Sequence, residues 1–273
     1  MKKRFNGLLL SRWSYAILAL AGGLCILFLP QNPRPAPEAM AWLTVGLLAG
    51  WAFGIAIHSI LLHQEFIRLH TGEKIRPAWE SWLWLLVSGV ELLAACWKLG
   101  SLTLNLFLVM GLLIAAVPLA EELGGLSAAA WAAASSLPAL IGWAALRQSL
   151  FQKADLPAWL MIFFLVLWIA GSELIGEASR SKLKGNENSF RKVFDWARIF
   201  QMLSLAPLFF LGQREEFGLI FGIILFAILV VSERQQRAVA KKDPSFNSMR
   251  TALVNISVSL LLLVGCLMGG WIK

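Results

Sequence analysis

The chain has 273 residues, of which 58% are hydrophobic and only 15% are charged. Soluble globular proteins carry about 25% charged residues, so this composition, with a mean hydropathy of +0.70, excludes a soluble globular protein and predicts a membrane protein. The net charge of +8 does not predict nucleic-acid binding, because no basic run is interleaved with a platform of residues that stack on bases.

Nine apolar stretches are predicted to be membrane-spanning helices. A span needs about 20 apolar residues, and lipid requires backbone polar groups to be satisfied within the chain, which makes helices the default. The stretches are 13–29, 40–62, 81–98, 101–119, 127–146, 157–177, 196–212, 216–232 and 250–271. Because most of the loops between them are short, residues 1–273 are expected to form a single all-α transmembrane domain.

The polar segments between the spans define the two sides. The Pro-rich segment 30–37 breaks the chain after the first span and is expected outside. Segments 63–80 and 178–194 are predicted to be cytoplasmic cap loops, and 233–250 a helix extension followed by a turn. The small residues of Ala128–Ser136 allow a close approach of helices.

The distribution of Lys and Arg predicts the orientation. Alternate loops, starting with the N-terminus, hold 18 of these residues, and the other side holds 6. By the positive-inside rule the N-terminus is cytoplasmic and the C-terminus lies outside. We expect a bacterial-type inner membrane.

Several aromatic residues and cysteines lie inside the predicted spans. Trp51, Trp131 and Trp168 either line an internal cavity or pack against other helices. The three cysteines, Cys25, Cys96 and Cys266, show no metal or disulfide spacing. We therefore expect them to be buried small hydrophobic residues.

Four segments carry a resemblance to a known family. From Leu137 to Arg180, a span of small residues ends in Gly-Trp-Ala-Ala, and a short outer loop leads to a Trp-Leu-Met span with acids at its end. A Gly-Ile-Ala-Ile-His-Ser run begins at Gly54, Arg76-Pro77 closes the first cap loop, and Phe246–Gly265 is also similar. These segments resemble the UbiA superfamily of intramembrane prenyltransferases. The resemblance implies nine transmembrane helices around a central apolar cavity, and transfer of a prenyl group from its diphosphate to a lipophilic or aromatic acceptor.

The superfamily holds Mg²⁺ against the diphosphate on two acidic motifs, N-D-x-x-D-x-x-x-D and D-x-x-x-D. Carboxylate oxygens suit Mg²⁺, and the ion stabilises charge that develops on the leaving group. In this chain the positions of the first motif are occupied by His58, Ser59, Leu62 and Phe66. A shift of the register by one residue, which places His63 at an Asp position, restores no carboxylate.

The second motif falls on Arg180 and Lys184, so the sign of the charge is inverted. The chain has three aspartates, Asp155, Asp195 and Asp243, and none lies in either predicted cap loop. Glu173 matches an acid one turn upstream of the motif. Magnesium is therefore a doubtful cofactor.

The resemblance gives each polar residue near the cavity two open interpretations. Glu173 and Glu177 either form a displaced catalytic magnesium site or are helix-end acids paired with basic neighbours. The histidines His58 and His63, with Ser59, are cavity polar groups or contribute to a metal site. Glu91 is a cavity acid or pairs with a polar group of a neighbouring span. A set of cations either binds a diphosphate or anionic head group or reflects positive-inside charge beside anionic lipid: Arg68, Arg76, Arg180 and Lys184.

Three functions remain open at this point. The first is a UbiA-like prenyltransferase with degenerate metal motifs. The second is a non-catalytic membrane subunit, with a protein partner, or a binder of an isoprenoid, quinone or pigment on the same fold. The third is acid-initiated isoprenoid cyclisation, which needs a protonated acid such as Glu91 or Glu173. The enzymes and the binder imply a lipophilic isoprenoid ligand, the subunit implies a protein partner in a membrane complex, and all of them contact membrane lipid.

Overall fold

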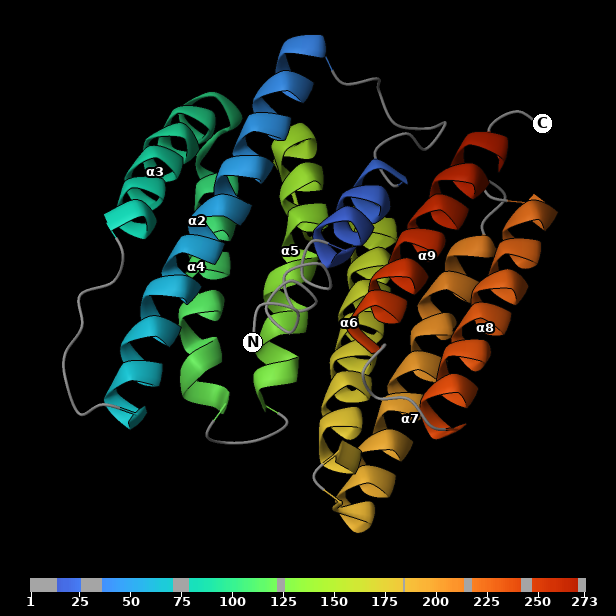
Figure 1. Ribbon diagram of the computed structural model, residues 1–273. Coiled ribbons are helices and arrows are strands. Elements are labelled where there is room, and N and C mark those ends of the chain that lie inside the picture. Colours follow the sequence, from blue (N-terminus) through green and yellow to red (C-terminus); the bar gives the residue numbers. More distant parts are fainter. Residues whose placement is uncertain are drawn as a thin grey trace.

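The computed structural model describes residues 14–25, 36–70, 79–121, 126–183, 185–213, 218–241 and 247–269. These residues form α-helices with one short 3₁₀ helix and contain no strand. The helices are Ser14–Cys25, α2 (Pro37–His70), α3 (Trp79–Leu99), α4 (Ser101–Glu121), α5 (Leu126–Arg147), η1 (Lys153–Asp155), α6 (Leu156–Leu183), α7 (Glu187–Gly212), α8 (Gly218–Lys241) and α9 (Asn247–Gly269). From α2 to α9 the helices run alternately down and up, so that α2, α4, α6 and α8 end at the lower end of the bundle in Figure 1.

Each of the nine predicted spans coincides with a helix, which confirms the all-α fold. Four helices of the described part are long and apolar enough to cross a membrane: Trp79–Leu99, Ala128–Arg147, Lys153–Ser179 and Glu187–Gly212. The apolar helices Ser14–Cys25, Ser101–Ile114 and Arg250–Gly265 are shorter. A bundle of such helices is an integral membrane protein, because their apolar surfaces need a lipid environment.

The described residues of the two predicted cap loops are mostly helical, which the polar composition of these segments did not predict. Helix α2 continues through residues 63–70, and α6 continues to Leu183. Polar residues favour water but do not interrupt a helix unless Gly or Pro intervenes. The break comes at Gly185, whose φ of +75° lies in the left-handed region. Asn186 then caps α7, because its side chain accepts a hydrogen bond from the backbone N–H of Ser189 at 3.1 Å.

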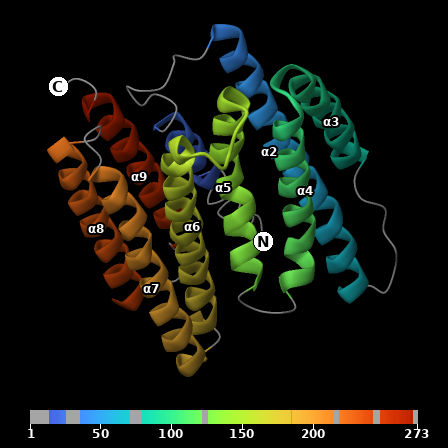
Figure 2. The same cartoon turned by 180° about the vertical axis from the view of Figure 1, so that it is seen from behind.

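Helix α5 joins two groups of helices. On one side α2 packs against α3, α4 and α5, and on the other α6 packs against α5, α7, α8 and α9. Figures 1 and 2 show α5 and α6 side by side in the middle of the bundle. A single large apolar core, which includes Trp143, Phe164 and Trp168, extends across both groups.

Glycines allow close contact between helices of each group. A Cβ atom added at Gly50 of α2 would lie 2.6 Å from Cε1 of Phe107 on α4, and one added at Gly54 would overlap Cδ1 of Ile114. In the other group, a Cβ atom at Gly171 of α6 would lie 2.8 Å from Cγ of Gln201 on α7 and 3.1 Å from a backbone carbonyl oxygen. Small residues are used in this way where transmembrane helices approach closely.

Asp155 stabilises the turn between α5 and α6 at the upper end of the bundle. Its buried carboxylate accepts hydrogen bonds from Trp143 Nε1 at 2.8 Å, from the Gln152 backbone N–H at 2.8 Å and from Ser149 Oγ at 3.1 Å. This aspartate therefore has a structural role at the end opposite to the predicted cytoplasmic mouth. Asp195, on α7, is exposed.

The cysteine prediction is half right. Cys25 and Cys96 are both buried, at 1% and 6% exposure. Cys96 is a free thiol, whereas Cys25 is disulfide-bonded, and its partner lies outside the described side chains. Spacing along the chain could not reveal this bond, because helix packing brings distant residues together.

Candidate functional site at the lower end of the bundle

Two carboxylates of α6 lie where this helix leaves the membrane. The 28 residues of α6 span about 42 Å at 1.5 Å per residue, which exceeds the hydrocarbon thickness of about 30 Å. Glu173 follows Leu156 by about 26 Å along the axis and Glu177 by about 32 Å. Both side chains are half-buried. Four residues apart, they share one face of the helix, and the next positions on that face are 180 and 184.

A small apolar cluster packs against this part of α6. It consists of Ala128, Leu174, Ile175, Ala178, Phe190 and Ala197, from the start of α5, the end of α6 and the start of α7. The cluster packs the end of α6 against the starts of α5 and α7, beside the face that carries Glu173 and Glu177. These carboxylates are thus positioned by packed helices and not by a loop.

The other predicted site residues are placed as follows. Ser59 lies on α2 and is exposed. His58, His63 and Arg68 lie on α2, and Arg180 lies on α6, but their side chains are outside the described part. Arg76 and Lys184 lie wholly outside the described residues. Whether these groups converge with Glu173 and Glu177 stays a prediction.

Glu91, for which a cavity acid and a partner of a neighbouring span were both open, is not buried. It is exposed on α3, a helix at the edge of the bundle that packs on α2 and, less extensively, on α4. Apolar residues lie on every side of α3, so hydropathy alone does not indicate which side faces the bundle.

Two of the three deep tryptophans stack on each other. The rings of Trp51 on α2 and Trp131 on α5 lie 6.2 Å apart at 11°, and both side chains are buried. The Trp51 indole nitrogen has no hydrogen-bond partner among the described residues. Trp168 instead packs in the core and donates to Asn255 Oδ1 at 3.0 Å, and Asn255 donates to Ser14 Oγ at 2.9 Å.

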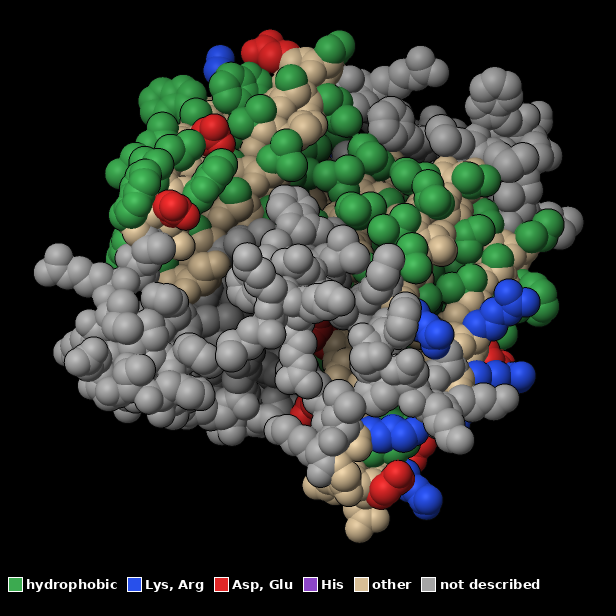
Figure 3. All heavy atoms as spheres, in the orientation of Figure 1, with side chains coloured by type: hydrophobic (Ala, Val, Ile, Leu, Met, Phe, Trp, Pro, Cys, Tyr) green, Lys and Arg blue, Asp and Glu red, His purple; other side chains and the backbone are tan. Residues whose placement is uncertain are grey.

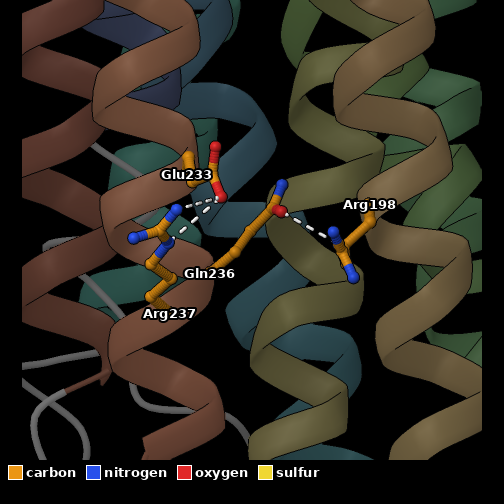
Figure 4. Close-up of polar contacts among 4 residues, drawn as sticks. All are labelled: Arg198, Glu233, Gln236 and Arg237. Carbon is orange, nitrogen blue, oxygen red and sulfur yellow. Dashed lines mark hydrogen bonds and ion pairs between the residues drawn. The ribbon is translucent and has the colours of Figure 1, made fainter.

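The sequence analysis missed a polar cluster between α7 and α8. The Gln201 side-chain oxygen accepts from Ser232 Oγ at 3.0 Å and from Gln236 Nε2 at 2.7 Å, and all three side chains are buried. Arg198 Nε donates to Gln236 Oε1 at 3.2 Å, as Figure 4 shows, while Arg237 pairs with Glu233 of its own helix at 2.9 Å. The run Ser-Glu-Arg-Gln-Gln-Arg at 232–237 was a visible signal, because positions 232 and 236 share a helix face.

Charged and hydrophobic side chains are separated on the face of the molecule that Figure 3 shows. Charged side chains gather at its lower right, whereas hydrophobic side chains cover most of its upper part. The lower ends of α6, α7 and α8 lie in this charged region in Figure 1. This polarity fits a bundle whose lower end meets water.

The described donors at this end do not form the two-magnesium site that the resemblance implies. Among the described residues, no group of three or more His, Cys, Asp or Glu side chains could hold a metal ion. The alignment expected from the resemblance places Ser59, Leu62, Phe66, Arg180 and Lys184 at the five aspartate positions, and this assignment stays a prediction. Hydroxyl, apolar and cationic side chains cannot replace the anionic oxygens that Mg²⁺ prefers.

An all-helical membrane bundle with an acid pair at the end of α6 is thus the class of protein that the structure defines. No protein-family model matches the sequence, and no curated protein matches it either. Solved structures do match over nearly the whole chain. A UbiA homologue from Aeropyrum pernix K1 matches with a TM-score of 0.71 at 14% identity, covering 94% of this chain and 97% of the other.

Two further structures give the same result. A digeranylgeranylglyceryl phosphate synthase matches with a TM-score of 0.67 at 14% identity, covering 99% of each chain. A UbiA homologue from Archaeoglobus fulgidus matches with a TM-score of 0.56 at 11% identity, covering 97% of this chain and 100% of the other. The chain therefore has the UbiA fold, as the sequence resemblance predicted. The central apolar cavity stays a prediction.

Proposed function

We propose that the chain is a divergent UbiA-type intramembrane prenyltransferase, which transfers the prenyl group of a prenyl diphosphate to a lipophilic or aromatic acceptor. The whole-length likeness to UbiA homologues, one of them a prenyl-lipid synthase by its name, is the observation that carries the proposal. The half-buried pair Glu173 and Glu177 lies at the end of α6, where the resemblance puts the reaction. The prenyl chain would occupy the apolar interior bounded by α2, α5 and α6.

In the proposed reaction the bond between prenyl C1 and the diphosphate oxygen breaks, and diphosphate leaves with the bonding electrons. C1 forms a bond to an acceptor carbon, which then loses a proton. We assign Glu173 as the base that takes this proton, because a carboxylate at the edge of the hydrocarbon region is poorly solvated and lies within reach of a lipophilic acceptor. Glu177, one turn further out, would orient the acceptor.

The cations Arg68, Arg76, Arg180 and Lys184 are proposed to hold the diphosphate directly. Guanidinium groups bind phosphate oxygens through two parallel hydrogen bonds, and Lys supplies a point charge. Arg180 and Lys184 continue the α6 face that begins with the acid pair. Because the donors do not fit magnesium, no step of the reaction is assigned to it.

A second candidate function is a non-catalytic binder of an isoprenoid, quinone or pigment. Two features favour it. The alignment expected from the resemblance leaves no aspartate in either motif, and the stacked Trp51–Trp131 pair leaves a buried indole N–H of Trp51 without a described partner. Such a donor suits a carbonyl oxygen of an apolar ligand. Both candidates share the membrane location and the lipophilic ligand.

The proposed orientation places the N-terminus in the cytoplasm and the C-terminus outside, in a bacterial-type inner membrane. The 18-to-6 distribution of Lys and Arg supports it. The disulfide of Cys25 also supports it, because the first helix would carry Cys25 to the outer side, where disulfides persist.

Turnover separates the two candidates. The full chain in lipid nanodiscs is incubated with geranylgeranyl diphosphate labelled in the prenyl group and with 4-hydroxybenzoate, and labelled product and released diphosphate are measured. A transferase gives both, and Glu173→Gln lowers the rate by about 10²-fold or more, whereas the control Glu187→Gln, at an exposed acid of α7, leaves it unchanged. Bound label without diphosphate release, over a panel of phenolic and lipid acceptors, supports the binder instead.

A further inference from the structure

We propose that the outer face of α3 is a docking surface for a transmembrane helix of another protein, and that this partner helix carries a Lys or Arg at mid-membrane depth that pairs with Glu91. The inference is independent of the reaction proposed above, because α3 contributes no residue to that reaction. It starts from Glu91, an exposed acid on the apolar helix α3, where an unpaired carboxylate in contact with lipid is costly.

Glu91 lies close to the middle of the membrane. It follows Trp79 by twelve residues and precedes Leu99 by eight, which corresponds to about 18 Å and about 12 Å along the axis. The hydrocarbon core is about 30 Å thick. Lys98, near the end of the helix, can extend its long side chain to the interface, but a glutamate at the depth of Glu91 cannot.

The surroundings of Glu91 on this face are apolar. On the same side of the helix as Glu91, Trp84 and Val87 are exposed, at 62% and 38%, and Ala94 is exposed as well. Among the described residues, no side chain forms a hydrogen bond or an ion pair with Glu91. An ionisable group in contact with lipid is costly and is normally paired or turned to the bundle interior. Here the pairing group has to come from outside the described chain.

The face also has the spacing of a helix–helix seam. Trp84, Val87, Glu91, Ala94 and Lys98 are all exposed, and they follow one another at intervals of three and four residues, as at the contact positions of paired helices. Ala94 is small, which allows the partner backbone to come close to Glu91. Acidic side chains interrupt the hydrophobic surface at the upper left of Figure 3, over α3.

Charge decides between the possible occupants. In a symmetric dimer the same patch meets itself, so a second copy packed along this seam would bring two Glu91 carboxylates together. A basic side chain on a different helix neutralises the acid instead, and it gains its own partner in an environment where neither is solvated. Complementary charge therefore points to a basic transmembrane helix of another protein.

The test uses a defined probe. The full chain, with a fluorescent donor fused to its C-terminus, is reconstituted in liposomes with an acceptor-labelled Leu/Ala transmembrane peptide that has one Lys at its centre, or Leu at that position as the control. Energy transfer reports association. We expect the Lys peptide to associate more tightly than the Leu peptide, and Glu91→Leu to weaken its association by roughly three- to twentyfold.

Control variants test whether association depends on the charge of Glu91. Glu80→Gln removes an exposed acid at the start of the same helix and should leave association unchanged. Glu91→Gln, which keeps the shape of the side chain, should behave like Glu91→Leu, and neither should lower thermal stability because Glu91 has no described partner. Equal association of the Lys and Leu peptides, or of wild type and both Glu91 variants, overturns the proposal. Glu91-dependent energy transfer between two copies of the chain also overturns it, in favour of self-association.

Discussion

Replacing Asp155 tests the structural role that the turn between α5 and α6 assigns to it. In Asp155→Ala the buried indole N–H of Trp143, whose side chain is 1% exposed, loses a charged acceptor at 2.8 Å. A hydrogen bond to a charged group contributes about 1.5–3 kcal/mol, and a buried donor without a partner costs about 1–3 kcal/mol. Ser149 and the Gln152 backbone N–H lie nearer to water and add about 1 kcal/mol together. Because the two figures for Trp143 describe the same lost contact, we expect a total loss of about 2.5–4 kcal/mol in the free energy of unfolding.

The assay is reversible unfolding of the purified chain by SDS in mixed micelles, followed by tryptophan fluorescence. Asp155→Asn, which keeps an acceptor oxygen, should lose about 1–2 kcal/mol. A double-mutant cycle with Trp143→Phe should show a coupling of about 1.5–3 kcal/mol between the two side chains. If Asp155→Ala stays within about 0.5 kcal/mol of wild type, or if the cycle shows no coupling, the turn does not depend on this carboxylate.

Two further changes separate packing from composition. Gly171→Leu should destabilise the chain by about 1–3 kcal/mol, because a Cβ atom at this position would lie 2.8 Å from Gln201. The control Gly176→Leu lies on the same helix, where an added Cβ would meet no atom within 4 Å, and it should unfold like wild type. Equal SDS midpoints for the two variants would contradict the close contact between α6 and α7. Asn255→Leu should lower the free energy of unfolding by about 2–3 kcal/mol, because it removes the buried hydrogen bonds that connect Trp168 to Ser14 of the first helix. In the same assay the control Ser257→Ala, which removes an exposed hydrogen bond within α9, should change the stability little. An equal loss of stability in both variants would show that the hydrogen bonds of Asn255 do not stabilise the bundle.

The helices were predictable from the sequence, because apolar stretches of sufficient length have few other solutions in a membrane. Their ends were less predictable. Residues 63–70 and 178–183 continue α2 and α6 although many of them are polar. Polar side chains mark where a helix meets water, but they do not end its backbone hydrogen bonding. The local signal for the true break was Gly185 followed by Asn186, a left-handed glycine and a helix cap.

For the candidate site, only the relation between residues of one helix was predictable from their spacing. Glu173 and Glu177 had to share a face of α6, and the structure places both half-buried at its lower end. The direction of Glu91 depends on how α3 packs on α2, which hydropathy does not encode when a helix is apolar on all sides. The partners of Gln201 and Asp155 depend likewise on tertiary contacts, so the α7–α8 cluster and the upper turn could not be assigned beforehand.

Binding of a prenyl diphosphate tests the central claim most directly. The full chain is released from mild detergent into native mass spectrometry with geranylgeranyl diphosphate or geranylgeraniol, in EDTA. The account predicts one diphosphate per chain, bound at least about tenfold more tightly than the alcohol, because cations hold the diphosphate without metal. The double variant Arg180→Glu, Lys184→Glu should remove this preference. No mass addition, equal affinity for the two ligands, or binding that requires magnesium would contradict it.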